Sequence, residues 1–585
     1  MQKTSFQINK YLRRSIIGLL AGLFGGVLLG ITLHNNGLGI VLGVLVGILY
    51  AIGFRSTRGA YAENVMTAAF FGVALWAAVT IILLPLLAGQ PPQWTAEGMR
   101  HSFPALVGWV LYGASIGLLT QALNSLAYRS LGPEYQPLRP VQAVKTNIVI
   151  AGGGFAGVMV AERLESLFRA DPSVAFTLVS DTNSLLFTPM LTEVAGGSLE
   201  PTHISTPLRS SLHRTQVVYG RIEGIDTPHK SVMVKQVGQA LQQREISFDH
   251  LVLALGSVSN YLGLTGVEET AFDFKSLEDA IRLRDHVITM LELSDQEQDQ
   301  LRRKAQLTFV IAGAGFAGAE LAGALNDFVR GALPYYPNIK AEEDQIVVVH
   351  SRATILPELS SSLADYALER MKARGVTFKL NTRLLDAKDG VMTLQPDEEL
   401  HAETLVWTAG VTPNPLVRDL PAEHDKRGAV VVEQTLAVPG MTGLWALGDC
   451  AYVPDARTGE ACPPTAQFAI REAKTVADNI YASIHGKPLK AFRFDALGIL
   501  CVVGYQTACA EIKGWRFSGF FAWVLWRGIY LSKLPGFERK IRVLSDWIVE
   551  LFFPPDIVQT IHVEQRTQRS SENAVEATIS SSEQR

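Results

Sequence analysis

The sequence predicts an α/β protein with two parallel-sheet domains, preceded by an all-α bundle of four apolar helices. Two glycine motifs indicate the α/β part: NIVIAGGGFAG begins at Asn147, and FVIAGAGFAGAELAG begins at Phe309. Each motif places an apolar strand directly before G-x-G-x-x-G and the start of a helix, which is the pattern of a Rossmann-like fold. The bundle is indicated by long apolar segments within residues 1–130.

The glycine spacing of both motifs predicts a cradle for a dinucleotide. The first glycine permits a tight turn, the second lets a pyrophosphate approach the backbone, and the third lets the helix pack closely on the sheet. These positions are Gly152, Gly154 and Gly157 in the first motif and Gly313, Gly315 and Gly318 in the second. Two cradles in one chain predict two dinucleotides, a flavin that stays bound and a nicotinamide that exchanges.

Composition restricts the class of protein. The 585 residues leave room for several domains, and 48% of them are hydrophobic, which is more than an ordinary soluble enzyme carries. The net charge of −4 comes without a basic stripe, which argues against a nucleic-acid partner. The four cysteines form no C-x-x-C, so we expect structural thiols in a reducing compartment rather than a redox pair. No metal site is expected.

Residues 1–130 are expected to form a transmembrane module. Four segments are each close to the roughly 20 residues needed to cross a bilayer, and none contains Lys, Arg, Asp or Glu. They are Ser15–Leu33, Gly37–Phe54, Val65–Ala88 and Phe103–Leu126. Because no ionisable group lies at membrane depth, we expect an anchor rather than a pump or channel.

Positive charges beside these segments predict the topology. Lysines and arginines precede the first segment and follow the second and the fourth: Lys3, Lys10, Arg13, Arg14, Arg55, Arg58, Arg129, Arg139 and Lys145. The positive-inside rule then places both ends of the module, and the domains that follow, in the cytoplasm. We expect a multi-pass protein of the inner membrane of a prokaryote.

Small residues recur every four positions in the first two segments. The positions are Gly18, Gly22, Gly26 and Gly30 in the first segment and Gly39, Gly43 and Gly47 in the second. Such a stripe lets helix backbones approach closely in lipid. It serves either oligomerisation, for example as a homodimer, or packing within the four-helix bundle.

After the module, a first domain is expected to be interrupted by a second. FDHLVLALGS predicts a strand that ends at Gly256, and LWALGDCA predicts a late strand of the same domain. Asp449 in the latter suits a ribityl hydroxyl, or it caps a turn. The expected boundaries are 145–306 and 413–515 for the first domain and 307–412 for the second.

The order of the motifs resembles the type II NADH:quinone oxidoreductases, single-subunit flavoprotein dehydrogenases, over about residues 145–555. Besides the two cradles, the resemblance is carried by LLFTPML, LVLALGS, ELAGAL, VWTAGV, LWALGDCA, PPTAQFAIREAK and a Trp-rich C-terminus. It implies non-covalent FAD, hydride transfer from NADH or NADPH to the flavin, and two-electron reduction of a membrane quinone without proton pumping.

The resemblance also implies roles for particular residues. Those expected at FAD are Gly152, Gly154, Phe155, Gly157, Asp181, Gly256, Gly448, Asp449 and Ala466. Those expected at the nicotinamide dinucleotide are Gly313, Gly315, Gly318, His350, Arg352 and Gly410. Asp181 is an imperfect match for the acid that binds the flavin ribose, because the strand itself ends in Ser180.

Three residues are expected to be catalytic. Glu320 either acts where nicotinamide and isoalloxazine stack, or is only a favourable charge near a helix N-terminus. Gln467 corresponds to the family's glutamine between flavin and quinone, and we expect it to orient by hydrogen bonds because an amide does not donate a proton near neutral pH. Arg471 stands where the family usually has a second glutamine, and could place a cation near a developing quinol anion.

The end of the second cradle's next strand bears on the nucleotide. Gln345–Val349 is followed by His350 and Arg352, where an NADH enzyme usually has an acid against the ribose hydroxyls. An arginine there could accept a 2′-phosphate, so that NADPH is used as well as NADH. The alternative is that Arg352 is a solvated surface charge.

The C-terminal region is expected to return to the membrane. Phe517–Leu534 and Ile541–Phe553 mix aromatic and aliphatic residues with lysines and arginines, which favours helices lying in the bilayer interface. The alternative is a helical hairpin packed on the FAD domain. We assign 516–563 to these helices and 564–585 to a disordered tail.

Three other functions fit the sequence less well. A sulfide:quinone oxidoreductase needs cysteines between the first cradle and Asp449, and this chain has none there. A reductase of a small soluble redox protein would need a charged docking face and no interfacial helices. A non-enzymatic flavin sensor would not need the second cradle.

Overall fold

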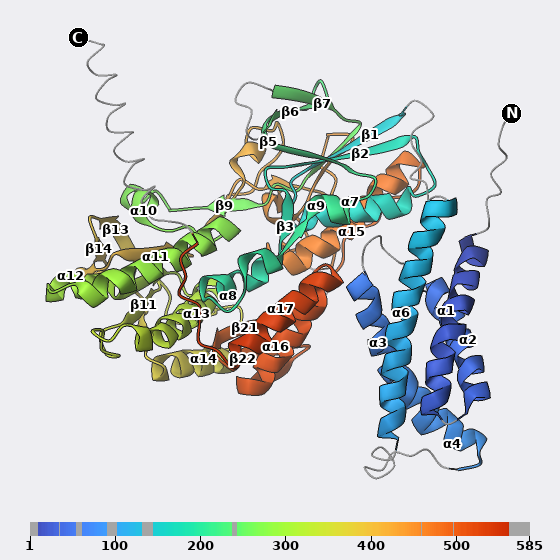
Figure 1. Cartoon of the computed structure of the whole chain (residues 1–585). Helices are drawn as coiled ribbons and strands as arrows, with labels where there is room; N and C mark the ends of the chain where they lie inside the picture. Colours follow the sequence, from blue (N-terminus) through green and yellow to red (C-terminus); the bar gives the residue numbers. More distant parts are fainter. Residues whose placement is uncertain are drawn as a thin grey trace. The chain divides into compact units, whose positions relative to one another are not determined.

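The computed structural model describes residues 10–33, 35–53, 61–90, 102–131, 144–236, 243–457, 459–494 and 497–560. The chain divides into two compact units, Met1–Arg139 and Pro140–Arg585, which are described separately (Figure 1). The tail predicted at residues 564–585 lies outside the described residues.

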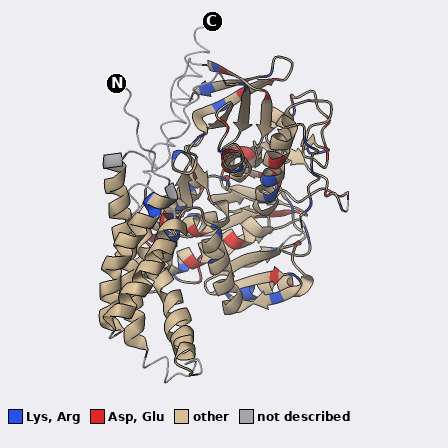
Figure 2. Cartoon of the chain, turned by 90° about the vertical axis from the view of Figure 1, so that its right-hand side faces the viewer, with Lys and Arg blue, Asp and Glu red and all other residues tan. Residues whose placement is uncertain are grey.

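The first unit is helical in its described part. Its elements are α1 (Lys10–Thr32), α2 (Asn36–Gly53), the continuous run α3 (Tyr61–Leu75), η1 (Trp76–Leu83, a π-helix) and α4 (Leu84–Leu87), and α6 (Phe103–Leu131). Four stretches are long and apolar enough to cross a membrane: Leu12–Thr32, Asn36–Gly53, Asn64–Leu87 and Phe103–Ala127. Each overlaps one predicted segment, and Figure 2 shows almost no charged residues along them. Lys3, Arg55, Arg58 and Arg139, which carry the topology prediction, lie outside the described residues.

The glycine stripes of α1 and α2 face each other. A Cβ on Gly22 would lie 2.4 Å from the carbonyl oxygen of Gly43, and a Cβ on Gly26 would lie 2.9 Å from that of Gly39. Backbones this close leave no room for side chains, so the two helices touch along their glycines. The two glycine stripes are therefore used for packing between α1 and α2, as in the prediction of packing within the four-helix bundle.

The first α/β domain is built on a seven-stranded sheet with the order β19-β8-β1-β2-β5-β6-β7. Five strands run parallel: β1 (Thr146–Ala151), β2 (Val174–Ser180), β5 (Gln216–Asp226), β8 (His250–Leu253) and β19 (Leu444–Ala446). β6 (Ser231–Gln236) and β7 (Gln243–Ser247) continue the sheet antiparallel. β19 comes late in the chain yet pairs with β8, so this sheet is built from segments on both sides of the second glycine motif.

Helices α7 (Phe155–Leu167) and α15 (Ala466–Ile484) pack together against this sheet. Ile148 and Ile150 of β1 are fully buried, as expected for a parallel strand covered on both faces. The shorter elements around the sheet are β3 (Ser184–Leu186), η2 (Thr188–Met190), α8 (Leu191–Ala195), η3 (Pro201–Ile204), β4 (Ser205–Pro207), α9 (Leu208–Ser211), β9 (Ser257–Ser259), β17 (Val411–Pro413), η5 (Pro415–Val417), β18 (Val430–Val431), η6 (Gly448–Cys450) and β20 (Ala451–Tyr452).

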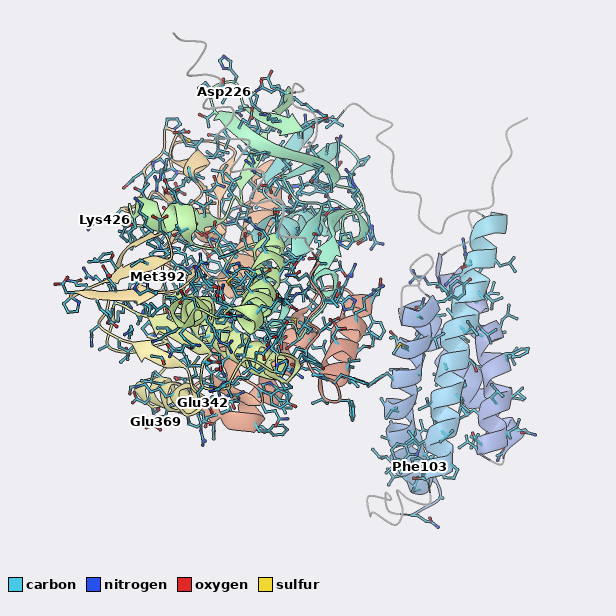
Figure 3. The ribbon with its side chains drawn as sticks, turned by 60° about the vertical axis from the view of Figure 1, so that its left-hand side comes forward. Phe103, Asp226, Glu342, Glu369, Met392 and Lys426 are labelled. Carbon is cyan, nitrogen blue, oxygen red and sulfur yellow. The ribbon has the colours of Figure 1, made fainter. Side chains whose placement is uncertain are left out.

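The second domain has a four-stranded parallel sheet with the order β12-β11-β10-β16. The strands are β10 (Thr308–Ala312), β11 (Gln345–Val349), β12 (Thr377–Lys379) and β16 (Thr404–Trp407). One face packs against α11 (Leu277–Gln296) and α13 (Phe316–Ala332). The other packs against β13 (Leu384–Lys388), β14 (Val391–Leu394) and β15 (Glu398–His401), where Figure 3 marks Met392. α11, which precedes β10 in the chain, already contributes to the core of this sheet.

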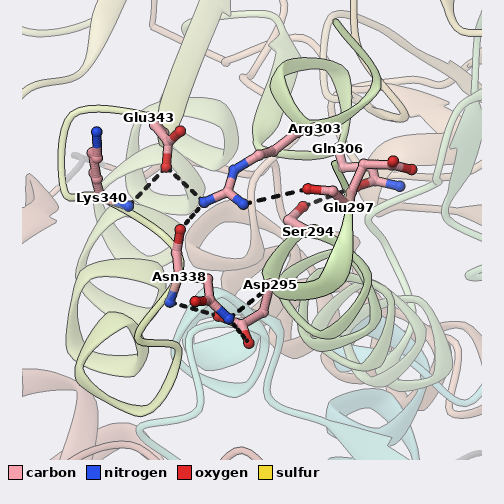
Figure 4. A network of polar contacts seen from close by, with 8 residues as sticks. All are labelled: Ser294, Asp295, Glu297, Arg303, Gln306, Asn338, Lys340 and Glu343. Atoms are coloured by element: carbon pink, nitrogen blue, oxygen red, sulfur yellow. Dashed lines mark hydrogen bonds and ion pairs between the residues drawn. The ribbon is translucent and has the colours of Figure 1, made fainter. Parts of the chain in front are cut away.

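The outer end of α11 is fixed by a polar network (Figure 4). Arg303 of α12 (Gln300–Gln306) pairs with Glu343 at 2.9 Å and also donates to the carbonyl oxygen of Asn338. Asn338 donates from its backbone N–H to Asp295, near the end of α11, at 2.9 Å. The network thus fastens α11 and α12 to the loop that leads into β11. Three further helices complete this part: α10 (Thr265–Thr270), η4 (Leu333–Tyr335) and α14 (Ser361–Ala373).

The C-terminal region combines a small sheet with two helices. β21 (Gly498–Gly504), β22 (Thr507–Ile512) and β23 (Trp515–Ser518) form an antiparallel sheet that packs on α13. α16 (Gly519–Lys533) and α17 (Phe537–Glu550) follow and lie side by side (Figure 1).

These two helices have one face packed on the rest of the protein and one face that is exposed. Their inner faces bury Trp526 and Trp547 in the core that also contains α8, α11 and α13. Their outer faces expose large apolar side chains: Phe520, Phe521, Val524, Leu544, Ile548, Val549, Leu551, Phe552 and Phe553. The pair is therefore a packed hairpin that also presents an apolar surface.

Candidate active site

The first cradle lies between β1 and α7. Gly152 has a φ of +115°, a conformation that other residues rarely adopt. A Cβ on Gly157 would lie 1.9 Å from the carbonyl oxygen of Gly152, so only glycine lets α7 begin so close to β1. A Cβ on Gly154, directly before α7, would meet no atom within 4 Å. This open space at a helix N-terminus fits the pyrophosphate of a dinucleotide.

The second cradle, between β10 and α13, repeats this geometry. Gly313 has a φ of +113°, and a Cβ on Gly318 would lie 2.0 Å from the carbonyl oxygen of Gly313. Gly315, directly before α13, again has no atom within 4 Å of an added Cβ. His350 Nδ1 accepts a hydrogen bond of 3.2 Å from the backbone N–H of Ala314. The histidine predicted at the nicotinamide site therefore contacts the cradle loop itself.

The polar residues predicted at the strand ends are exposed. Asp181 follows the last residue of β2, and Arg352 follows β11 by three positions. Both lie at the carboxyl edge of a parallel sheet, where such sheets bind their ligands.

Burial and the charge of Arg352 lower the pKa of His350, which favours the neutral imidazole that can accept the bond from the cradle.

A network at the carboxyl edge of the first sheet adds Lys275 to the residues predicted from the sequence. Asp449 Oδ2 accepts a hydrogen bond of 2.7 Å from Ser257 Oγ. Lys275 Nζ donates to Ser257 Oγ at 2.7 Å and to the carbonyl oxygen of Ser257 at 2.9 Å. Burial lowers the pKa of Lys275, and the charge of Asp449 opposes this. The predicted FAD residue Asp449 is thus linked through Ser257 to a partly buried cation.

Glycine turns flank this network. Gly256 has a φ of +68° with open space around it, and Gly448 has a φ of +69°. The backbone N–H of Gly448 donates to Glu472 at 2.8 Å. Burial raises the pKa of Glu472 to about 7. Gly410 accepts a hydrogen bond of 3.1 Å from the backbone N–H of Asn260, which joins the two domains at the interruption.

Glu320 lies in the second turn of α13, where this helix meets the C-terminal sheet. Its Oε1 accepts a hydrogen bond of 3.2 Å from the backbone N–H of Val502 in β21. Burial raises the pKa of Glu320 to about 8, and the bond from Val502 opposes this rise. At neutral pH the carboxyl group therefore holds a proton, which is the form able to donate one.

Gln467 contacts the other end of β21. Its Nε2 donates to the carbonyl oxygen of Gly498 at 3.3 Å, and its Oε1 accepts from the backbone N–H of Leu497 at 3.1 Å. Gly498 and Val502 are four residues apart on one strand, or roughly 13 Å. β21 therefore brings Gln467 and Glu320 to the same region of the molecule.

The remaining predicted residues lie around the starts of α7 and α15. Ala466 is the first residue of α15, and Arg471 is exposed on the same helix, with its guanidinium 5.3 Å from the ring centre of Phe494. This contact orients the guanidinium, and because a ring carries no net charge it does not neutralise the positive charge of Arg471. Phe155 begins α7 and packs edge-to-face on Phe187, with ring centres 5.7 Å apart.

Two further charged residues, not predicted as site residues, form a pair. Glu193 lies in the apolar motif LLFTPMLTEVAGG, and Arg527 lies in the apolar α16. Arg527 Nη2 lies 3.7 Å from Glu193 Oε1. The available signal in the sequence is a single charged residue within an apolar stretch.

Two family descriptions match the chain. "Pyridine nucleotide-disulphide oxidoreductase" matches residues 146–473, and "NDH2 C-terminal domain" matches residues 497–555. The second match includes β21–β23, most of which lie within the predicted FAD-domain segment 413–515.

Curated relatives and a solved structure agree. The chain is 31% identical over 435 residues to the type II NADH:quinone oxidoreductase Ndh of Mycobacterium tuberculosis, covering 71% of this chain and 89% of that protein. It is 29% identical to the demethylphylloquinone reductase NdbB of Synechocystis, covering 69% and 96%. The structure of NDH2 from Plasmodium falciparum in complex with NADH superposes with a TM-score of 0.66 at 17% identity, covering 71% of this chain and 100% of that one, which shows the fold.

Both cradles are complete, and the matches cover both α/β domains and the C-terminal region. The cofactor is FAD, and NADH is the electron-donating substrate. The chain belongs to the type II NADH:quinone oxidoreductases, the FAD-dependent enzymes that pass electrons from NADH to a quinone.

Proposed function

We propose that this chain is a multi-pass membrane enzyme that reduces a membrane quinone from a catalytic region on the cytoplasmic side. The observation that carries the proposal is β21, which contacts Glu320 at one end and Gln467 at the other. The same small sheet leads directly into α16 and α17, whose outer faces expose apolar side chains. The C-terminal region, β21 to α17, therefore contacts the candidate site residues and also carries the apolar surface.

FAD would be held by the first cradle and by the network at Asp449. The backbone N–H groups at the start of α7 suit its pyrophosphate, and the Asp449 carboxylate suits a ribityl hydroxyl. When bound, FAD supplies the two-electron carrier between nicotinamide and quinone. The chain's own part is to hold the two dinucleotides in place and to keep water out.

Gln467 and Arg471 would act at the quinone. Glu320, expected from the sequence where nicotinamide and isoalloxazine stack, is assigned to the quinone as well because β21 links it to Gln467. Glu320 is protonated at neutral pH and so can give a proton to a quinone oxygen. The amide of Gln467 is fixed by two backbone groups, which sets its orientation. Arg471, exposed on α15, would stabilise developing negative charge.

Membrane attachment would come from both ends of the chain. The four apolar helices are long enough to span, and α16 and α17 would lie in the interface beside Arg539, Lys540 and Arg542. This arrangement would bring the quinone end of the site to the lipid surface. It also argues against a small soluble redox protein as the acceptor, because such a partner needs a polar docking face.

We further propose that NADPH is accepted as well as NADH. The support is Arg352, exposed beyond β11 near His350, at the position where a 2′-phosphate would lie. The domain division proposed from the sequence is kept, with the C-terminal domain extended back to residue 497 to include β21–β23.

The membrane part of the proposal is tested by deleting residues 1–130. We expect the full chain to remain with membranes after an alkaline wash, whereas the shortened chain is released but still reduces a short-chain quinone with NADH. A shortened chain that resists the wash as firmly as the full chain would contradict the assignment of the four helices as the principal anchor.

A further inference from the structure

A cavity of about 790 Å³ opens where the second half of α13 faces the end of α17. The loop after α8, the end of α14 and the turn at Tyr505 complete its wall. The volume falls within the roughly 300–1,000 Å³ of small-molecule sites. None of the described residues that line it is among those expected at FAD, at the nicotinamide or in catalysis. The cavity is therefore a separate candidate site.

Carboxylates outnumber cations in the wall of this cavity. Its acids are Glu200, Asp327, Asp546, Glu550 and Asp556, and its bases are Arg330 and Arg374. Arg374 is in contact with Asp327. Arg330 Nε lies 3.8 Å from Oδ2 of Asp344, a buried acid behind the wall. Both arginines are thus already drawn to carboxylates.

Two acids at the mouth leave negative charge in excess. Glu200 and Asp556 are exposed, and neither has a basic partner in the part of the chain that the structure describes. Asp546 and Glu550 are each paired with a base from outside the wall. The cavity therefore favours a cation over an anion.

A buried amide indicates that the ligand also donates a hydrogen bond. Asn326 is 2% exposed and lines the cavity from α13, one helical turn before Arg330. Asn326 Oδ1 has no hydrogen-bond partner among the described residues. Because a buried acceptor without a donor is unfavourable, a ligand that donates an N–H to this oxygen would be stabilised.

An apolar wall lies beside these polar groups. Phe328 is 1% exposed and packs on Gly197, where an added Cβ would lie 2.9 Å from the ring. At the mouth, Val549 of α17 and Phe553 beyond it are 53% and 65% exposed. Both also belong to the apolar surface of the C-terminal helices. A ligand with an apolar body would therefore contact protein at both depths of the cavity.

We propose that this cavity binds a primary ammonium group carried on an apolar molecule. The ammonium group donates to Asn326 Oδ1, the carboxylates of Glu200 and Asp556 balance its charge, and Val549 and Phe553 contact the apolar part. Two sources have this chemistry, a membrane phospholipid with an ethanolamine headgroup and a soluble amine. The lipid source rests on the interfacial position of α17 proposed above, whereas the ammonium site itself does not.

The first test compares three probes that share one ring. Benzylamine, benzyl alcohol and benzyltrimethylammonium are titrated calorimetrically into the purified full-length holoprotein in detergent. The alcohol lacks the charge, and the quaternary ammonium has the charge but no N–H. We expect benzylamine to bind about tenfold more tightly than either. An alcohol or a quaternary ammonium that binds as tightly as benzylamine would overturn the proposal.

The second test assigns the binding to this cavity. Asn326→Leu, which is close in shape but has no acceptor, should weaken benzylamine binding about tenfold and leave the alcohol unaffected. If Asn326→Leu does not fold, the exposed pair Glu200→Gln and Asp556→Asn serves, and together they should weaken benzylamine binding several-fold. The matched control is Glu538→Gln, an exposed acid of α17 outside the cavity, paired with Arg542 at 2.7 Å. Wild-type affinity in the folded cavity variants would overturn the site.

The third test separates the two sources. The full-length protein is placed in nanodiscs of phosphatidylcholine, alone or mixed with phosphatidylethanolamine, and benzylamine is titrated again. A headgroup that occupies the cavity lowers the apparent affinity for benzylamine in the mixed nanodiscs, whereas equal affinity in both overturns the lipid source. These titrations use neither NADH nor quinone. Absence of benzylamine binding would therefore overturn this inference and leave the proposed function intact, and failure of quinone reduction would leave the ammonium site intact.

Discussion

One small substitution in each cradle can show which dinucleotide that cradle binds. Gly315 has φ −73° and ψ −168°, and Gly154 has φ −78° and ψ −169°, all of which alanine adopts without strain. An added Cβ at either position meets no protein atom within 4 Å. Gly315→Ala and Gly154→Ala should therefore fold normally, and the new methyl group should meet only a bound pyrophosphate.

The magnitude follows from the contacts that the methyl group would prevent. A hydrogen bond from a backbone N–H to a charged oxygen contributes about 1.5–3 kcal/mol. Loss of one such bond raises Kd about 10- to 150-fold. We expect Gly315→Ala to weaken NADH binding by this factor and to keep its FAD, and Gly154→Ala to lose FAD by a similar factor.

The assay is titration of the purified variants with NAD⁺, which carries the same pyrophosphate but does not reduce the flavin, monitored by flavin fluorescence, together with the FAD content after gel filtration. Gly224→Ala on β5, where an added Cβ also meets open space, is the control. If Gly315→Ala binds NAD⁺ within about twofold of the wild-type affinity, the assignment of the second cradle is refuted.

Four further outcomes are expected. Arg352→Ala should lower the ratio of kcat/KM for NADPH over NADH about tenfold, and an unchanged ratio would mean a surface charge only. Lys275→Met should weaken FAD binding about tenfold, measured as FAD release during dilution, because Ser257 and Asp449 lose their cation. Glu320→Gln should slow quinone-dependent flavin recovery about 10²-fold without changing the rate at which NADH bleaches the flavin. In the wild type, the rate of this recovery should fall as pH rises through about 8, because Glu320 then loses its proton. Gly43→Leu, whose Cβ would lie 2.5 Å from Gly26 Cα, should lower the thermal midpoint of the helical module in detergent, whereas Gly53→Leu, with open space around it, should not.

The cradles were predictable from the sequence because their physics is local. A strand, a glycine turn and a helix start lie within about a dozen residues, and the steric reason for Gly157 lies in its own cradle. The apolar spans were predictable for the same reason, since length and composition suffice. Their glycine stripes were ambiguous, because the sequence alone does not say which helix a stripe meets.

The charged clusters were not predictable, because they join segments that are far apart in the chain. Lys275 is linked to Asp449 through Ser257, and Glu193 contacts Arg527, only after the folding of both domains and the C-terminal helices. No spacing rule connects such pairs. The role of β21 was missed for a similar reason, because its contacts with Glu320 and Gln467 cross from one domain to the other.

The most direct test of the central claim is anaerobic mixing of the full-length protein with NADH and then with a short-chain quinone, monitored by flavin absorbance. The account predicts rapid bleaching by NADH and full recovery when quinone is added. Bleaching without recovery would contradict quinone as the acceptor, and no bleaching would contradict the assignment of the two cradles.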